Sequence, residues 1–200
     1  MSLPAPLVRF AVHDFLLVRA LWLAAGRKVD VRAGETPIRY GAEILLMLWV
    51  VLVIDGGLLL VLHLALPWVW VRRALLVLGI AGTVWLLGFI VTFSVYPHTV
   101  GGGRLRLRFA AMRDYTVPLA AVRSVAVDRR HWQIGGTAAV VDGGLVLPVQ
   151  NSTNMSITLG RPVEVVAGRD RTPVPVTRVS FAADDPSAAR VLIETMMSRR

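Results

Sequence analysis

Apolar residues fill residues 41–95 almost without interruption, whereas residues 96–200 carry charged residues at short intervals. The stretch 41–66 is long enough to cross a hydrocarbon core of about 30 Å as a helix that rises about 1.5 Å per residue. The stretch 74–95 contains no charged residue and has the same character. The pattern therefore predicts a membrane hairpin of two helices, followed by a water-soluble domain.

The segment between the two apolar stretches has the composition of a turn at a membrane surface. Pro67 breaks helices, and tryptophans such as Trp68 and Trp70 concentrate at membrane interfaces. Arg72 and Arg73 add two positive charges directly after them. We therefore expect a tight turn over 67–73, with Trp68 and Trp70 in contact with the headgroup layer of the bilayer.

Basic residues on the two flanks of the hairpin outnumber the two in the turn. They are Arg27, Lys28, Arg32 and Arg39 before the hairpin and Arg104, Arg106, Arg108 and Arg113 after it. Since positive charge is retained on the cytoplasmic side, both flanks are predicted to be cytoplasmic and the turn to face outward. The formal net charge of +9 is assigned to this topology and to anionic lipid, not to nucleic acid.

Residues 7–25 form a third apolar stretch, but it contains Arg9, His13, Asp14 and Arg19. We interpret it as an amphipathic helix that lies on the membrane or packs against the hairpin, with a true crossing as the alternative. Gly26 fits the end of this helix. The residues that follow, up to 40, have turn chemistry at Gly34 and Pro37 and are predicted to form an ordered connector. The chain then divides into residues 1–40, 41–95 and 96–200.

The hydrophobic period changes after the second apolar stretch. Residues 104–109 alternate between arginine and an apolar residue, which predicts a strand with one buried and one solvated face. Further strands are predicted over 114–118, 121–128, 137–141, 145–149, 155–159, 163–167 and 174–181, separated by turns that contain glycine. The pattern favours a β-rich domain.

The C-terminal residues predict one amphipathic helix. Asp184 and Asp185 offer a carboxylate cap, and Pro186 suits the first helical position. Four apolar residues recur at helical spacing and are expected to face the core: Ala189, Leu192, Ile193 and Met196. Ser187, Arg190 and Glu194 are expected to face water, together with Val191 as the one apolar exception. Strands that end in such a helix describe a small barrel with a helical plug.

Several segments carry a resemblance to a known family. They are Tyr96–Val100, Leu105–Phe109, Val117–Val125 and the closing run Val179–Pro186. With Asn154–Leu159 and Pro162–Val165, they resemble bacterial pleckstrin-homology-like (PH-like) domains, especially those fused to transmembrane hairpins in actinobacterial membrane proteins. The resemblance implies a partly open barrel of about seven strands capped by a C-terminal helix. Domains of this family mostly bind lipids, peptides or proteins, and the fold alone does not define the ligand.

Asp55 lies inside the first apolar stretch, where a carboxylate costs roughly 2.5 to 3.5 kcal/mol on insertion scales. Three interpretations follow. Asp55 is protonated and hydrogen-bonded within the hairpin, with Thr83 as the candidate partner; or it contacts a partner subunit; or, with His63 two turns further on, it belongs to a proton path. The residues alone leave these interpretations open.

A basic and aromatic cluster, Arg129, Arg130, His131 and Trp132, is predicted to lie in a loop. It suits contact with a membrane surface or a protein partner, and a solvated loop with one anchoring aromatic side chain is the alternative. The sequence has no cysteine and no GxSxG, HExxH, P-loop or Rossmann motif. We therefore expect no enzyme, no cofactor and no metal site.

These observations lead to one expected function and one alternative. The first is a non-enzymatic adaptor of the bacterial plasma membrane, whose PH-like domain binds a protein partner or organises a membrane complex at the cytoplasmic face. The alternative is an accessory subunit of a transport or cell-envelope assembly complex, in which Asp55 takes part directly.

Overall fold

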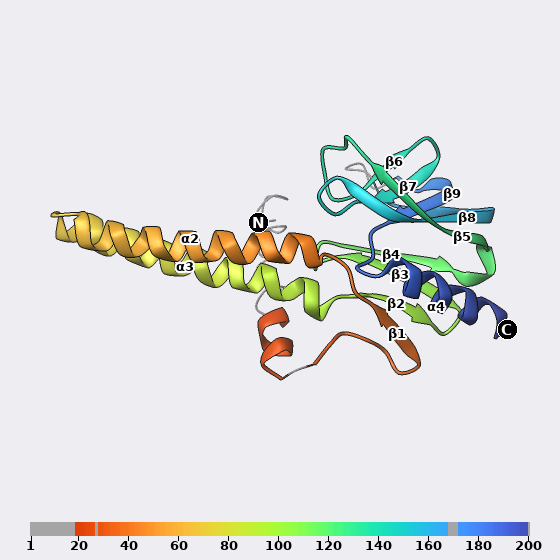
Figure 1. The fold of residues 1–200 in the computed structure, drawn as a ribbon, viewed down its shortest axis with the longest axis horizontal. Coiled ribbons are helices and arrows are strands. Elements are labelled where there is room, and N and C mark those ends of the chain that lie inside the picture. The colour runs from red at the N-terminus through yellow and green to blue at the C-terminus, as the bar shows by residue number, and fades with distance from the viewer. Residues whose placement is uncertain (1–18, 27, 168–171, 200) are drawn as a thin grey trace, which may run out of the picture. The chain divides into compact units, whose positions relative to one another are not determined.

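A computed structural model describes residues 19–26, 28–167 and 172–199 (Figure 1). The chain divides into two compact units. The helical unit contains the chain before Val29 together with Glu43–Val95. The β unit contains Val29–Ala42 and Tyr96–Arg200, so the predicted connector joins the C-terminal domain and does not stand apart from it.

The helical unit is built on α2 (Ala42–Ala65) and α3 (Val69–Val95). Both helices are long and apolar enough to cross a membrane, in agreement with the two predicted apolar helices. The predicted turn over 67–73 is too long, because Arg72 N already donates to Trp68 O and α3 begins at Val69. Only three residues separate the helices, and Trp70 lies in the first turn of α3.

The two helices meet along a seam of less exposed residues that recur at alternating spacings of three and four. On α2 these include Leu48, Leu52, Asp55, Leu59 and Leu62, and on α3 they include Leu76, Gly79, Thr83, Leu86, Ile90 and Phe93. This spacing is that of coiled-coil packing. At Gly79 a Cβ atom would lie 2.5 Å from Leu59 Cδ1, so glycine at this position lets the helices approach closely.

Part of the predicted N-terminal helix is described. Residues 19–25 are helical, and Lys28 N donates to Leu23 O just beyond their end, at the place that Gly26 predicts. The earlier part of the predicted helix, residues 7–18, lies outside the described residues.

The first sheet of the β unit has four antiparallel strands in the order β1-β2-β3-β4. They are β1 (Glu35–Ile38), β2 (His98–Gly101), β3 (Arg104–Phe109) and β4 (Arg113–Pro118). Strand β1 was not predicted, because Pro37 was interpreted as a turn residue. Proline is tolerated here since β1 is an edge strand, where a missing N–H donor costs no ladder bond.

The helical hairpin is therefore an insertion between two neighbouring strands. Strand β1 precedes α2, β2 follows α3, and the two strands pair in register from Glu35 opposite Gly101 to Ile38 opposite His98. The strands also approach closely at Gly101, where a Cβ atom would lie 2.4 Å from Gly34 O. Both ends of the hairpin thus leave from one end of the same strand pair.

The second sheet has five strands in the order β5-β8-β9-β7-β6. They are β5 (Val122–His131), β6 (Ala139–Val141), β7 (Gly144–Leu147), β8 (Ser152–Val165) and β9 (Val174–Phe181), with β7 and β9 parallel and the other neighbours antiparallel. The two strands predicted over 155–159 and 163–167 are one strand, β8. Gly160 lies within it, where the register with β9 shifts between Thr158 and Val163, and does not form a turn.

The described residues form nine strands in these two sheets, instead of about seven. The hydrophobic pattern itself gave eight strands; it missed β1 and β2 and divided β8 into two, which accounts for the nine. Strands β3 and β9 have the predicted bounds. The coarse prediction of a helical hairpin joined to a β-rich region with a C-terminal helix is confirmed.

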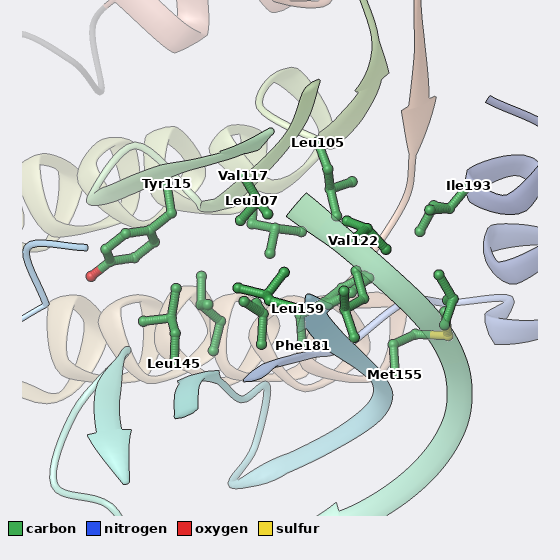
Figure 2. Close-up of a cluster of buried hydrophobic side chains, with 14 of the residues drawn as sticks. Leu105, Leu107, Tyr115, Val117, Val122, Leu145, Met155, Leu159, Phe181 and Ile193 are labelled. Carbon is green, nitrogen blue, oxygen red and sulfur yellow. The ribbon is translucent and has the colours of Figure 1, made fainter. Parts of the chain in front are cut away.

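Side chains from both sheets and from α4 (Pro186–Ser198) form one core in the β unit (Figure 2). Leu105 and Leu107 come from the first sheet, and Met155 and Phe181 come from the second; all four are fully buried. Ile193 of α4 is 0 % exposed and joins them, while Val191 is 62 % exposed. The orientation predicted for this helix is confirmed, and Asp185 caps it by accepting a hydrogen bond from Ala188 N.

Candidate functional site

Asp55 lies in the seam between α2 and α3 and is bonded within the hairpin. Thr83 Oγ1 donates to Asp55 Oδ2 at 3.4 Å, and Thr83 is the partner that the sequence suggested. Gly56 and Gly57, next to Asp55, face open space, since a Cβ atom at either position would meet no atom within 4 Å. The polar pair Asp55–Thr83 therefore fixes the register of the two helices in a seam that is otherwise mostly apolar.

His63 takes no part in the hydrogen bond between Asp55 and Thr83. It lies in the last turn of α2, and its Nδ1 atom is buried with no hydrogen-bond partner among the described residues. Asp55 and His63 lie eight residues apart, so about 100° of rotation per residue turns their side chains roughly 80° away from each other. The described hydrogen bonds therefore give no continuous path from one to the other.

The two tryptophans near the hairpin turn are highly exposed. Trp68 is 65 % exposed and Trp70 is 81 % exposed, and the guanidinium of Arg73 lies 5.7 Å from the centre of the Trp70 ring. An exposed tryptophan beside an arginine suits the interface between hydrocarbon and headgroups.

The cluster Arg129–Trp132 is not a loop as predicted. Strand β5 continues to His131, with Arg130 opposite Thr153 and His131 opposite Ser152 on β8. The strand persists because Trp132 N donates to Asn151 O, and Trp132 Nε1 donates to Thr153 Oγ1 at 2.9 Å. Trp132 is thus bonded to β8, while the side chains of Arg129 and His131 remain exposed.

The β unit contains a buried polar cluster that the sequence pattern did not predict, and two of its members, Tyr40 and Tyr96, flank the hairpin in the chain. We call it the junction cluster, and it consists of Asp30, Tyr40, Tyr96, His98, Arg108 and the loop Ala182–Asp185. All of these residues belong to the β unit. His98 lies at its centre, 2 % exposed, stacked on Tyr40 with ring centroids 4.1 Å apart and edge-on to Phe181.

Both ring nitrogens of His98 are engaged. Arg108 N donates to Nδ1 at 3.0 Å, which leaves Nε2 to carry the proton that it donates to Ala182 O at 3.1 Å. Burial lowers the pKa of His98 to about 3, and the positive charge of Arg108 acts in the same direction. His98 is therefore a neutral structural bridge, and neither nitrogen has a free lone pair for a metal ion.

Tyr40 and Arg108 complete the cluster. The Tyr40 hydroxyl accepts from Ala110 N at 2.6 Å and donates to Tyr96 O at 3.4 Å; its pKa is raised, mainly by burial. Arg108 Nη1 donates to Asp30 O, and its Nη2 lies 3.0 Å from Asp30 Oδ2 without the alignment of a hydrogen bond. Burial lowers the pKa of Arg108, and Asp30 and Asp114 oppose that effect.

The alternation of residues 104–109 predicted that Arg108 faces water, and this is wrong. Arg108 is 2 % exposed, because Asp30 of the connector and the ring of Tyr96 cover it, the latter with its centre 5.7 Å from the guanidinium carbon. Arg106, two residues earlier, is ion-paired with Asp114. The face of β3 that was expected to be solvated is thus partly covered by charged and aromatic side chains. The local alternation of residues does not reveal this cover.

The loop Ala182–Asp185 holds the junction cluster to the rest of the β unit. Asn154 on β8 bonds both the N–H and the carbonyl of Ala183, at 2.9 and 2.7 Å. Asp184 N donates to Arg39 O, and Asp184 Oδ1 accepts from Ala42 N, the first residue of α2. The sequence offered Asp184 and Asp185 equally as the cap of α4, but only Asp185 caps α4, and Asp184 instead bonds the start of α2.

Comparison with models of protein families, with curated proteins and with solved structures found no match for this chain. The class that the fold itself defines is a β-rich domain of two sheets and one helix, with a hairpin of two potential membrane helices inserted between neighbouring strands.

Proposed function

We propose that this protein is a non-enzymatic adaptor of the bacterial plasma membrane. In this proposal α2 and α3 cross the bilayer, and the β unit stands at the cytoplasmic face, where it binds a protein partner or organises a membrane complex. The distribution of positive charge supports that orientation. More basic residues precede the hairpin (Lys28, Arg32 and Arg39) than lie near its turn (Arg72 and Arg73).

One observation carries the proposal: the hairpin is inserted between β1 and β2, which pair directly. An ordinary anchor joins its domain through a single flexible link. Here two chain segments enter the β unit, each within a few residues of a paired strand, and the junction cluster bonds residues on both of them. Such a construction suits a domain that stays at a membrane surface and presents a contact surface to a partner.

A PH-like domain is the fold family that we propose for the β unit. Two packed sheets and a C-terminal helix in the core support it, as do the segments named in the sequence. The two strands beyond the expected seven and the parallel pairing of β7 with β9 are departures from the simplest form of that fold. The exposed Arg129 and His131 at the end of β5 form the contact surface that we favour for an acidic partner.

Affinity purification of the full chain from native membranes in mild detergent tests this function. We expect one or more proteins to co-purify in a stoichiometric complex, and the variant Arg129→Glu to reduce their recovery. Arg190→Glu is the matched control, because Arg190 is an exposed arginine on α4, distant in sequence. If both variants retained the same partners, the β5 surface would not be the contact; a chain recovered alone from native membranes would refute the adaptor.

Asp55 supports a second candidate, an accessory subunit of a transport or envelope-assembly complex. Its bond to Thr83 leaves the second carboxyl oxygen, Oδ1, without a described hydrogen bond. A working intramembrane carboxyl would need its acid–base chemistry, whereas an anchor needs only the packing. Asp55→Asn should therefore leave the function of an adaptor intact but abolish the function of a transport or assembly subunit. The measurement is the growth or envelope integrity of cells that depend on the protein. Thr83→Val is the control for the lost hydrogen bond.

A further inference from the structure

Four consecutive residues, Ala182–Asp185, form a dense set of connections in the β unit. Ala182 O accepts from His98 on β2, and Ala183 is bonded on both sides by Asn154 on β8. Asp184 bonds Arg39 and Ala42 through its N–H and its carboxylate. Asp185 accepts from Ala188 N and Ala189 N in the first turn of α4.

The bond from Ala42 N to Asp184 Oδ1, at 2.9 Å, is a helix cap supplied by a residue that is distant in the sequence. The first four N–H groups of a helix have no partner inside it, and a carboxylate at this end is favourable for both hydrogen bonding and charge. Gly41, the residue before Ala42, has φ +91°. This backbone conformation is unstrained only for glycine, and it turns the chain into α2. The start of α2 thus depends on Asp184.

The next residue, Asp185, performs the same task for α4. Two adjacent carboxylates therefore cap two different helices, one of which begins the membrane hairpin and the other of which plugs the β unit. One peptide unit separates the two capping residues. A backbone movement at either residue therefore also displaces the other carboxylate. Asn154 holds the residue before Asp184, Ala183, to β8 through two hydrogen bonds.

A second connection reaches the same loop from the other end of the hairpin. Tyr96, directly after α3, accepts a hydrogen bond from Tyr40, and Tyr40 stacks on His98, which bonds Ala182. Residues that flank α2 and residues that flank α3 are therefore both tied to the loop that starts α4. The physical basis of coupling is a shared set of bonds that two elements need at the same time.

We propose that the loop Ala182–Asp185 couples the first turn of α2 to the first turn of α4, so that loosening either helix start loosens the other. A ligand or partner that stabilises α4 then also stabilises the start of α2, and the effect is reciprocal by thermodynamic linkage. The device gives the adaptor a way to pass a binding event in the β unit to its membrane helices. The coupling itself does not depend on the adaptor role or on the identity of a partner.

Hydrogen exchange measured by mass spectrometry on the full chain in mild detergent tests the coupling. Ala42→Pro removes only the donor of the distant bond, because proline is well tolerated at the first position of a helix. We expect this variant to raise exchange at Ala188 and Ala189 by about fivefold, the factor expected from the loss of one helix cap. Asp185→Ala should in turn raise exchange over residues 43–46.

Three further variants make the result decisive. Asp184→Asn keeps an acceptor oxygen and should leave exchange at both helix starts close to that of the unchanged chain, whereas Asp184→Ala should raise it at both. Glu194→Ala, an exposed change on α4, should raise neither. The proposal is overturned if Ala42→Pro and Asp184→Ala alter exchange only near α2, and Asp185→Ala alters it only near α4.

Discussion

Ile38 and His98 are directly paired across the β1–β2 ladder, although the whole of α2 and α3 lies between them in the chain. Ile38 is 5 % exposed and belongs to the core of the β unit. The domain that follows the hairpin is consequently completed by a strand that precedes it. This relationship changes which part of the chain should fold by itself.

Residues 96–200 alone should be unstable, although the sequence pattern placed the start of the soluble domain at residue 96. Without β1 they lose the buried side chains of Ile38 and Tyr40, and Arg108 loses Asp30. Removal of one large core side chain typically costs about 2–5 kcal/mol. Residues 29–42 joined to 96–200 by a short glycine–serine linker should instead give a cooperative thermal transition and a β-rich circular dichroism spectrum. Equal melting temperatures for the two fragments would show that β1 is dispensable.

Helix α4 should be essential to the core of the same linked β unit. Ile193 is 0 % exposed, so Ile193→Asp buries a charge and removes an aliphatic side chain, and it should unfold or aggregate the domain. Glu194→Ala is the neighbouring control. It removes only an exposed ion pair with Arg190 and should change the free energy of unfolding by less than about 1 kcal/mol. Similar melting temperatures for the two variants would contradict the claim that α4 is an essential part of the core.

Acid should destabilise the β unit through His98. The pKa of His98 is about 3 in the folded state, below the ordinary value of 6.5, so the unfolded chain binds a proton that the folded chain rejects. The stabilisation is complete above pH 6.5 and is lost as the pH falls toward 3. Between about pH 6.5 and about pH 5, a slope of about 1.4 kcal/mol per pH unit amounts to a loss of about 2 kcal/mol.

Urea unfolding of the linked β unit at about pH 7 and about pH 5, on either side of the ordinary histidine pKa, measures this effect. His98→Gln should lower stability at neutral pH but reduce its dependence on pH, because the titrating group is gone. His131→Gln, which changes an exposed histidine, should keep the full dependence. A pH dependence that is the same with and without His98 would mean that another group is responsible.

The parts of the fold that local pattern determines were predictable. Period and length indicated the two apolar helices, strict alternation indicated β3, and apolar spacing with an acidic cap indicated α4. The N-terminal bound of α3 was missed because Pro67 and the arginines suggested a longer turn. The helix nevertheless begins at Val69, two residues after the proline, and Trp68 O accepts its first hydrogen bond.

The junction cluster was not predictable, because its bonds join residues far apart in the chain. Nothing local distinguishes Asp184 from Asp185, yet one caps α2 and the other caps α4. Likewise Arg108 has the spacing of a solvated residue and is buried by Asp30, which lies before the hairpin. Thr83 was only a candidate partner of Asp55, and the structure pairs them because antiparallel helices joined by a short turn place these two positions at the same level.

The orientation of the hairpin in the membrane is the central claim, and the chain lends itself to a direct test because it contains no cysteine. Single-cysteine variants at Trp68, beside the turn, and at Ser187, on the exposed face of α4, would be treated in intact cells with a maleimide that cannot cross membranes. We expect Trp68→Cys to be labelled in intact cells and Ser187→Cys to be labelled only after the cells are lysed. Labelling of Ser187→Cys in intact cells, with Trp68→Cys protected until lysis, would contradict a cytoplasmic β unit.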